Sequence, residues 1–424
     1  MSLLILILVL FALIGLPLFL VLSGLALAGF ISADLNPALY FAELLRLTNN
    51  PTLIAIPLFT FGGYLLAESN ASKRLVRLAN ALMGNLPGGL ALVALFIMAL
   101  FTAFTGASGI TIIAMGGLLL PALLKGGYSE RFSLGLLTAS GSIGLLFPPS
   151  LPLILYGVVA GTPIDKLFIA GIVPGLLLVS GMALYSVYIG SGTMKIRVDQ
   201  PKEPLLPAIK SAIWEIPLPF IVVGGIYGGF FTVTEAAVVT ASYLLIVECF
   251  IIRDLHPIRD LPRILTESSI LIGGILLILG AALALTNFLI FTDVPTIMLS
   301  WIKSVVTSRF AFLLLLNVFL LIVGCMMDIF SALVVVVPLI LPIALSYGID
   351  PIHLGVIFLA NLEIGYCTPP VGLNLFIASF RFKQPILKLY RAALPFLVIQ
   401  LIILALITYL PQLSLFPVSL FEGK

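Results

Sequence analysis

The sequence predicts an all-α polytopic membrane protein built as an inverted repeat, with two re-entrant helical hairpins and two helices broken at Pro-Pro. Of its 424 residues, 61% are hydrophobic and only 9% are charged, whereas a soluble domain carries about 25% charged residues. Apolar runs long enough to cross a bilayer core of about 30 Å recur along the chain. The polar interruptions of these runs recur in both halves at a constant separation, which indicates an internal repeat.

The apolar segments are the predicted membrane helices. In order, they are expected at 2–14, 17–31, 51–68, 87–104, 110–124, 132–146, 150–161, 167–190, 213–230, 233–251, 268–291, 310–326, 329–346, 353–366, 371–380 and 392–411. The first run lacks the basic region and the cleavage site of a secretory signal peptide, so we interpret it as membrane structure. Residues 36–49 and 255–268 alternate polar and apolar faces and are expected to lie at the membrane interface.

The segments group into two repeats. The first, 1–211, is expected to contain a re-entrant hairpin at 87–124, a broken helix at 132–161 and a cytoplasmic linker at 190–211. The second, 212–424, is expected to contain a hairpin at 310–346 and a broken helix at 353–380.

Basic residues cluster in alternate connections, and the positive-inside rule places these clusters in the cytoplasm. They include Lys73–Arg77, Lys125–Arg131, Lys195–Lys210, Arg253–Arg263 and Arg381–Arg391. The loops around Asp165 and Asp350 then fall outside, and the two hairpins enter from opposite faces. The N-terminus falls outside if residues 2–31 cross twice and inside if they cross once.

The repeat has a fixed register. Leu341-Pro342 follows Leu120-Pro121 after 221 positions (342 minus 121). The same shift pairs three further motifs: Gly127 with Gly348, Ile143-Gly144 with Ile364-Gly365, and Pro148-Pro149 with Pro369-Pro370. Opposite orientation of the hairpins makes this an inverted repeat, in which substrate and coupling ions bind between the halves near the bilayer midplane.

The first break, Thr105-Gly-Ala-Ser-Gly109, leaves backbone groups free of helical bonding in mid-membrane, where they must face protein, ions or water. Its carbonyls and hydroxyls suit Na⁺, and the helix N-terminus that follows suits an anion. The alternative is a patch of small residues for helix packing.

The other breaks carry different chemistry. Pro-Pro unwinds a helix locally, so Gly144–Ser150 and Gly365–Asn374 are predicted binding sites rather than simple kinks. The third break, Gly324–Ser331, places Asp328 in a hydrophobic stretch, where an acid marks a functional site by default. Asp328 is predicted to contact Na⁺, a proton or a polar substrate group, and it could also cap the helix that follows.

Other polar residues suggest local structural roles. Glu235 is predicted to close a capping box at the start of its helix, while Glu363 is left open between packing and function. His256 and His353 are placed in loops without metal partners, and the three cysteines are interpreted as small buried side chains.

Five stretches together resemble the large membrane subunit (M, or DctM-type) of tripartite ATP-independent periplasmic (TRAP) transporters. They are Ile56-Pro-Leu-Phe-Thr-Phe-Gly-Gly63, Phe104-Thr-Gly-Ala-Ser-Gly109, Ile143-Gly-Leu-Leu-Phe-Pro-Pro-Ser150, Phe231-Thr-Val-Thr-Glu-Ala-Ala237 and Thr368-Pro-Pro-Val-Gly372. The resemblance implies an elevator-type, Na⁺-driven importer of the bacterial inner membrane. Family substrates include C4-dicarboxylates and sialic acid, and the sialic acid type is one candidate here.

The resemblance also implies partners: a small four-helix membrane subunit and a periplasmic substrate-binding protein. The small subunit is expected as a separate chain, since no four-helix block precedes Met1. Nucleic acid is not an expected partner, because the net charge of +3 reflects basic connecting loops.

By motif, more than one Na⁺ is expected, each between a hairpin tip and a helix break, with no other metal. The implied Na⁺-binding residues are Thr105, Gly106, Ala107, Ser108, Gly144, Phe147, Pro149, Gly324, Met327, Asp328, Gly365, Thr368, Pro370 and Gly372. The implied substrate contacts between the tips are Ser108, Ser150, Asp328, Ser331 and Asn374.

Three alternatives differ in mechanism or class. A proton-coupled carboxylate transporter, or one that works without a binding protein, would share the fold. An intramembrane enzyme is disfavoured, because the sequence offers one well-placed Asp and no intramembrane His. A passive channel is disfavoured because paired inverted hairpins serve alternating access better than a continuous pore.

Overall fold

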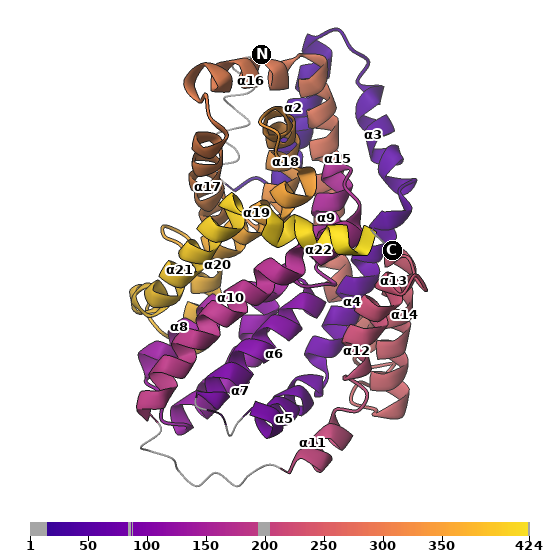
Figure 1. Cartoon of the computed structure of the whole chain (residues 1–424). Helices are drawn as coiled ribbons and strands as arrows, with labels where there is room; N and C mark the ends of the chain where they lie inside the picture. Colours follow the sequence, from indigo (N-terminus) through magenta and orange to yellow (C-terminus); the bar gives the residue numbers. More distant parts are fainter. Residues whose placement is uncertain (1–14, 84–85, 87, 194–203, 423–424) are drawn as a thin grey trace.

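The computed structural model describes residues 15–83, 86, 88–193 and 204–422, and all regular structure within them is helical (Figure 1). In this part of the chain, eight helices are long and apolar enough to cross a membrane, or nine if the bent pair over 130–160 is one span. The all-α polytopic fold class is therefore confirmed. The predicted segment at 2–14 lies outside the described residues.

The first half runs from α2 to α10. Its elements are α2 (Leu18–Ser32), α3 (Ala38–Thr48), η1 (Pro51–Ile54), α4 (Ala55–Glu68), α5 (Ala71–Met83), α6 (Gly89–Thr105), α7 (Ser108–Lys125), α8 (Glu130–Ala139), η2 (Ile143–Leu146), α9 (Leu151–Ala160) and α10 (Ile164–Thr193).

The second half runs from α11 to α22. Its elements are α11 (Leu205–Ser211), α12 (Pro217–Pro219), η4 (Phe220–Gly224), α13 (Gly225–Tyr227), α14 (Val233–Ile246), η5 (Val247–Ile251), α15 (Leu261–Phe291), α16 (Val294–Val305), α17 (Arg309–Met326), α18 (Ile329–Ser346), α19 (Pro351–Gly365), α20 (Leu373–Phe382), α21 (Ile386–Tyr409) and α22 (Gln412–Glu422).

The helices follow the repeat found in the sequence. A shift of 221 positions (329 minus 108) carries α7 onto α18, and the same shift carries α6 close to α17 and α9 close to α20. Both Pro-Pro bonds, Pro148-Pro149 and Pro369-Pro370, are cis. The two halves therefore have the same order of helices and breaks.

Each hairpin brings its two outer ends together. At the first, a Cβ on Gly126 would lie 2.7 Å from Leu90, so the end of α7 meets the start of α6. At the second, the Tyr347 hydroxyl donates to the carbonyl of Val306 at 2.6 Å. In Figure 1, α5, which precedes the first hairpin, lies at the bottom, and α16, which precedes the second, lies at the top. The hairpins thus point in opposite directions, in agreement with the predicted inversion.

The halves interlock through the second arm of each hairpin. Helix α7 packs on α20, and α18 packs on α9. Glycine permits the close approach of α7 to α20, where a Cβ on Gly109 would lie 2.6 Å from Ile377. The broken helices also touch each other through glycine, since a Cβ on Gly355 of α19 would lie 2.6 Å from Tyr156 of α9. Each broken helix therefore contacts hairpins from both halves.

The structure corrects two predictions about local structure and adds three helices. No separate interface helix forms at 255–268; α15 begins at Leu261, with Pro262 in its first turn, and continues unbroken to Phe291. His353 does not lie in a loop, because Asp350 caps α19 ahead of it. The His353 ring is buried against Ser414 Oγ at 2.7 Å. Helices α5, α16 and α22 were not predicted, because the charges and prolines of those stretches resemble connections.

Two local predictions are confirmed. Thr232 and Glu235 form a reciprocal capping box at the start of α14. Asp328 caps α18, where its Oδ2 accepts the N–H of Ser331 at 2.9 Å. Capping by Asp328 leaves its predicted ion or substrate role open, since a cap uses only part of a carboxylate.

Candidate functional site

The first hairpin tip lies against the first broken helix, as the sequence predicts. Gly106 ends α6 in the left-handed region (φ 63°), and a Cβ there would lie 2.3 Å from Leu151, at the start of α9. A Cβ on Gly144 would lie 2.2 Å from the carbonyl oxygen of Ala99 on α6. Glycine allows both contacts, one with a side chain and one with backbone, and they bring residues 105–108 and 144–151 into one cluster.

Hydroxyl groups connect this cluster internally. Thr102 Oγ1 lies 2.8 Å from both Thr111 Oγ1 and the carbonyl of Gly141. Thr105 Oγ1 lies 3.3 Å from Thr111 Oγ1 and 3.4 Å from the carbonyl of Ala107. All three threonines are buried. Three neutral hydroxyls and two carbonyls thus gather beside the break, where Na⁺ ligands are expected.

Thr102, Thr111 and Gly141 were not among the predicted site residues. The sequence feature that could have identified the two threonines is their helical spacing. Thr102 lies one turn before Thr105 on α6, and Thr111 lies one turn after the start of α7. That spacing alone also fits a hydroxyl bonded to its own helix, as Thr138 is to Leu134. Only the fold brings the two helix faces together.

The residues that flank the first Pro-Pro pair also stabilise the local structure. Ser150 caps α9 by accepting the N–H of Leu153 at 3.3 Å, and its hydroxyl donates to the carbonyl of Leu145. The Phe147 ring packs over Gly175 of α10. Pro148 and Pro149 lie between Phe147 and Ser150 in the chain. The predicted substrate role of Ser150 therefore competes with a local role in holding the start of α9.

The second hairpin tip meets the second broken helix in an equivalent way. A Cβ on Gly365 would lie 2.7 Å from the backbone of Gly324, so α17 and α19 touch through glycine. The N–H of Gly372 donates to the carbonyl of Cys325 at 3.1 Å. The Tyr366 hydroxyl accepts the N–H of Ile329 at 2.6 Å. The predicted pairing of 324–328 with 365–372 is therefore present in the geometry.

The remaining predicted residues of the second cluster differ in their surroundings. Asp328 is exposed at the tip, and Met327, before it, is half-buried. The Thr368 hydroxyl donates to the carbonyl of Ile364 at 2.9 Å. Pro370 is exposed, and its carbonyl accepts the Tyr390 hydroxyl at 2.6 Å. Ser331 is buried one turn after Asp328. Asp328 is thus the one charged group of the predicted set.

The two clusters meet in a buried contact. Ser142 Oγ donates to the carbonyl of Glu363 at 3.1 Å, and these residues are 221 positions apart, the same separation as the repeats. Asn374 Nδ2 donates to the same Ser142 hydroxyl at 3.3 Å. The Glu363 side chain is fully buried, and within the described residues neither carboxyl oxygen has a hydrogen-bond partner. Ser142 and Glu363, which no site prediction included, mark the contact between the halves.

An open cavity of about 890 Å³ lies between three connections, 50–52, 157–165 and 226–235. Its polar lining includes Thr52, Thr162, Thr232 and Thr234. Most of the Phe231–Ala237 motif lines this cavity. Positive-inside placement of the Asp165 loop puts this cavity on the expected outer face.

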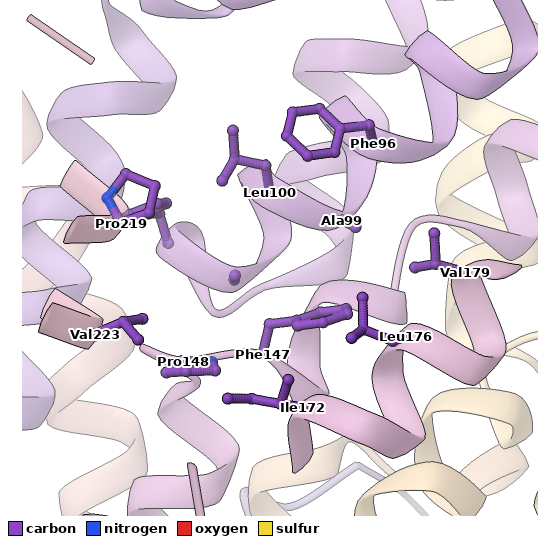
Figure 2. Close-up of a pocket in the computed structure, with 12 residues that line it drawn as sticks. Phe96, Ala99, Leu100, Phe147, Pro148, Ile172, Leu176, Val179, Pro219 and Val223 are labelled. Carbon is purple, nitrogen blue, oxygen red and sulfur yellow. The ribbon is translucent and has the colours of Figure 1, made fainter. Parts of the chain in front are cut away.

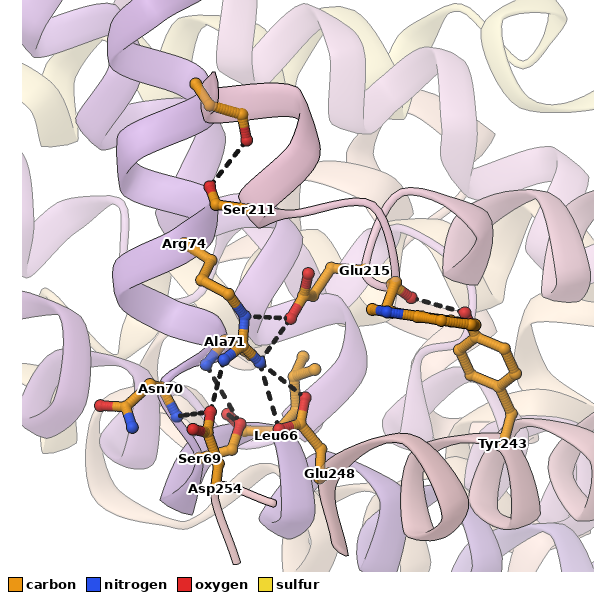
Figure 3. Close-up of polar contacts among 12 residues, drawn as sticks. Leu66, Ser69, Asn70, Ala71, Arg74, Ser211, Glu215, Tyr243, Glu248 and Asp254 are labelled. Atoms are coloured by element: carbon orange, nitrogen blue, oxygen red, sulfur yellow. Dashed lines mark hydrogen bonds and ion pairs between the residues drawn. The ribbon is translucent and has the colours of Figure 1, made fainter. Parts of the chain in front are cut away.

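A charged network surrounds Arg74 on α5 (Figure 3). Its guanidinium contacts Glu215 at 2.5 Å, Glu248 at 2.9 Å, and Asp254. Burial raises the pKa of Glu215, although the Arg74 charge opposes the shift. Burial would also raise the pKa of Asp254, but hydrogen bonds from Arg74 and Asn70 hold it below its ordinary value. One cation therefore joins α5 to the α11–α12 connection, to η5 and to the connection that follows η5.

Known proteins match the chain over nearly its whole length. A family model described as the tripartite ATP-independent periplasmic transporter, DctM component, matches residues 4–413. The C4-dicarboxylate TRAP transporter large permease protein DctM of Pseudomonas aeruginosa is 38% identical over 88% of this chain and 87% of its own. The isethionate TRAP transporter permease protein DctMQ of Oleidesulfovibrio alaskensis is 36% identical over 96% of this chain and 64% of its own.

A solved structure supports the fold independently. The crystal structure of the Alcanivorax borkumensis YdaH transporter superposes with a TM-score of 0.63, covering 87% of this chain and 86% of that one at 13% identity. At this identity the likeness concerns the fold alone. The family match and the relatives decide the class: the chain belongs to the DctM family of tripartite ATP-independent periplasmic transporters, as a permease rather than an enzyme and a multi-pass protein of the bacterial inner membrane.

Proposed function

We propose that this chain is the translocating subunit of a Na⁺-coupled secondary transporter that imports a small organic anion by an elevator motion. The observation that carries the proposal is the matched pair of hairpin-tip and helix-break clusters, which meet at Ser142 and Glu363. Discontinuous helices in inverted repeats bind ions and substrate between the repeats, and alternating access moves one part of the protein around that site.

Support for Na⁺ comes from the donor set of the first cluster. Hydroxyl oxygens and backbone carbonyls are neutral ligands that suit a monovalent hard cation. Thr102, Thr105 and Thr111 supply such oxygens close to the break at Gly106. In the second cluster, Asp328 supplies a carboxylate beside the carbonyl-rich turn at 365–372. We therefore assign one ion to each cluster.

Support for an anionic substrate comes from the hairpin tips. The first turns of α7 and α18 begin at the tips, and helix N-termini present N–H groups and partial positive charge to anions. Ser108 and Ser331 lie in these first turns, and Asn374 lies near the junction of the halves. A carboxylate repels an anion in direct contact, so we propose Asp328 primarily as an ion ligand.

The relatives favour C4-dicarboxylates as the substrate class, because the Pseudomonas relative carries that name. The isethionate relative, which is named for an organic sulfonate, widens the class to small organic anions generally. The sialic acid type stays a prediction. We further propose delivery by a periplasmic binding protein and assembly with a small membrane subunit. The prediction that this subunit is a separate chain is untested, since the DctMQ relative extends beyond the part that this chain matches.

The deciding experiment is uptake by the reconstituted protein with its small subunit, against a panel of anions and matched binding proteins. Replacing external Na⁺ with choline is expected to abolish uptake at constant pH and membrane potential. Uptake that survives in choline and follows a pH gradient would replace Na⁺ coupling with the proton-coupled alternative. Uptake at full rate without any binding protein would refute the proposed delivery.

Single variants test the first ion site. Thr102→Val and Thr111→Val remove hydroxyls with little change of volume, and each is expected to raise the half-saturating Na⁺ concentration. A hydrogen bond or ligand to a charged group contributes about 1.5–3 kcal/mol, or about 10–150-fold in affinity. Thr240→Val is the matched control, because Thr240 is equally buried but bonds only to its own helix. Equal Na⁺ dependence in all three variants would remove the site from the proposal.

A further inference from the structure

Buried oxygens without hydrogen-bond partners gather where the two broken helices meet. Three helices of the second half, α19, α20 and α21, pack there against α8 or η2 of the first half. Within the described residues, unpartnered side-chain oxygens come from each of these helices and from the end of α8; they belong to Glu363, Asn374, Gln400 and Ser140. All four residues are fully buried. Buried polar atoms are nearly always paired, so this group indicates a ligand that the side chains themselves do not supply.

Hydrogen bonds fix which ends of the two amides stay free. Gln400 Nε2 donates to the carbonyl of Ala139 at 3.3 Å. Asn374 Nδ2 donates to Ser142 Oγ at 3.3 Å, and that hydroxyl donates in turn to the carbonyl of Glu363 at 3.1 Å. Because both amide nitrogens already have acceptors, the amide oxygens are the groups without partners. An amide oxygen accepts a hydrogen bond or binds a cation, and it cannot donate.

Glu363 is the charged member of this group. It lies near the end of α19, a short apolar helix, and Cys367 follows it by about one helical turn. The Glu363 carboxyl interacts electrostatically with the Cys367 thiol, and Asn374 Nδ2 reaches the same thiol at 3.9 Å. The carboxyl and the Asn374 amide therefore lie beside one thiol. No described basic side chain pairs with Glu363, although an unpaired charge in a membrane protein is costly.

The number of free oxygens distinguishes a cation from a proton. A proton on Glu363 would remove the charge, but it supplies one donor and so serves one acceptor. The remaining amide oxygens would stay unpartnered. A cation balances the charge and attracts several oxygens at once. A divalent ion would leave one positive charge unbalanced in the interior, which is unfavourable. One carboxylate with amide oxygens therefore fits a single monovalent cation.

The two cavities that flank the first broken helix do not serve these oxygens. The cavity beside Phe147 and Pro148 is lined only by apolar residues (Figure 2). The cavity of about 890 Å³ is lined by the connections around Asp165 and Thr232. Neither Glu363 nor Asn374 lines either cavity. The occupant is therefore enclosed by protein, and protein oxygens replace its hydration shell.

We propose that Glu363 anchors a site for a monovalent alkali cation at the contact between the two broken helices, with the Asn374 amide oxygen as a further ligand. The site is separate from the ions assigned to the two clusters, because it contains no residue of a hairpin tip. Its cation holds α19 and α20 against the segment between α8 and η2. The inference does not require that the protein transports Na⁺.

The test is equilibrium binding of radioactive Na⁺ to the purified full-length protein in detergent, at constant ionic strength and pH. Glu363→Gln keeps the shape of a protonated glutamate and removes the charge, so it is expected to bind one Na⁺ fewer per chain than the wild type. An unchanged number would overturn the proposal, because a protonated Glu363 predicts that result.

Glu248→Gln is the matched control. Glu248 is as deeply buried as Glu363, but it pairs with Arg74 at 2.9 Å. This variant is expected to bind as many Na⁺ ions as the wild type. Equal losses in Glu363→Gln and Glu248→Gln would assign the effect to a general loss of structure and overturn the proposal.

Competing ions identify the occupant. Displacement of this Na⁺ by K⁺ but not by choline would support a site for alkali cations in general. Resistance to both would support a Na⁺-selective site. Displacement by choline as readily as by K⁺ would overturn the proposal, because choline cannot replace a dehydrated ion among buried oxygens.

Two further measurements do not depend on Glu363→Gln. Asn374→Leu keeps the carboxylate and removes one ligand, so it is expected to weaken the affinity for one Na⁺ by about 10-fold or more; unchanged affinity would overturn the proposed ligand set. In the wild type, dicyclohexylcarbodiimide modifies protonated carboxyl groups in apolar surroundings. Na⁺ is expected to slow modification of the Glu363 peptide several-fold relative to choline, and equal rates would overturn the site.

This inference and the proposed function can fail separately. Thr102→Val and Asp328→Asn test the ions of the two clusters. Loss of Na⁺ in those variants but not in Glu363→Gln would reject the site at Glu363 alone. Loss of Na⁺ only in Glu363→Gln would support this site and reject the two ions assigned to the clusters.

Discussion

Arg74→Met is the substitution for which the structure predicts the largest loss of stability among the charged residues. Arg74 contacts Glu215, Glu248 and Asp254 with its guanidinium, and its side chain is only 14% exposed (Figure 3). Methionine keeps most of the aliphatic stem of arginine and removes the charge. The change therefore isolates the electrostatic part of the network.

The magnitude follows from the burial of the partners. The Glu248 and Glu215 side chains are 0% and 1% exposed, so removal of Arg74 leaves at least two carboxylates buried beside each other without a cation. Breaking a buried ion pair by removal of one partner costs about 3–5 kcal/mol, because the remaining charge is uncompensated. Glu215 Oε2 already lacks a hydrogen-bond partner within the described residues, so the network has little spare capacity to adjust.

The measurement is the free energy of unfolding in mixed micelles, obtained by titration with a denaturing detergent. Arg46→Met is the matched control, because Arg46 pairs with Glu43 at 3.5 Å while 76% exposed. An exposed pair contributes about 0–1 kcal/mol. The expected result is a loss of about 3–5 kcal/mol for Arg74→Met and a loss no larger than the exposed-pair range for Arg46→Met.

A double variant separates charge from packing. Glu215→Gln in the Arg74→Met background removes one of the uncompensated carboxylates and is expected to recover part of the loss. Contacting groups in one network couple by about 0.5–3 kcal/mol. Equal unfolding free energies for Arg74→Met and Arg46→Met, or strictly additive losses in the double variant, would refute the view that the Arg74 charge stabilises these contacts.

Three further predictions follow from named contacts. Gly144→Ala is expected to abolish uptake and lower stability, because its Cβ would lie 2.2 Å from a backbone carbonyl oxygen. Gly274→Ala is the control: a Cβ there meets open space in α15, so the change is expected to be neutral or stabilising by up to about 1 kcal/mol. Similar thermal unfolding of both alanine variants would contradict the prediction for Gly144→Ala. Burial raises the pKa of Glu215 above its ordinary 4.5, so the folded state holds that proton more tightly than the unfolded chain. Stability should then fall as the pH rises from 4.5 through the raised pKa, and Glu215→Gln should remove this part of the profile; an unchanged profile would contradict it. Asp328→Asn is expected to depress Na⁺-driven uptake while keeping the cap on α18, since asparagine also caps helices; a normal rate would leave Asp328 with the capping role alone.

The sequence predicts the breaks well because glycine and proline act on their own backbone. Gly106 and the two Pro-Pro pairs interrupt helices wherever they stand in the fold, and the structure places the interruptions there. The constant separation of the repeats also needs no structure, since it is a property of the chain. These local features account for where the helices are interrupted.

Contacts between distant segments could not be predicted in the same way. The hydrogen bond from Ile329 to the Tyr366 hydroxyl joins two helices across the second site, and neither residue type marks it in the sequence. Thr102 and Thr111 resemble hydroxyls bonded to their own helices until α6 and α7 are folded together. The length of α15 was also not predicted. The polar residues near its start resemble a separate interface helix, but no residue after Pro262 interrupts the helix.

The two halves share the same order of helices and breaks, but their clusters have different side-chain chemistry. Shifting the three first-cluster threonines by 221 positions gives Val323, Met326 and Ala332, which offer no hydroxyl. The same shift carries Ala107 onto Asp328. Under the proposed function, an ion in the second cluster is balanced by a carboxylate, whereas an ion in the first is held by neutral oxygens and leaves a net positive charge beside the hairpin tip. An anionic substrate would supply the missing negative charge, so binding of Na⁺ at the first cluster and of the anion should strengthen each other. Thr102→Val should therefore reduce the factor by which Na⁺ raises anion affinity in equilibrium binding, and an unchanged factor would place the coupling ion elsewhere.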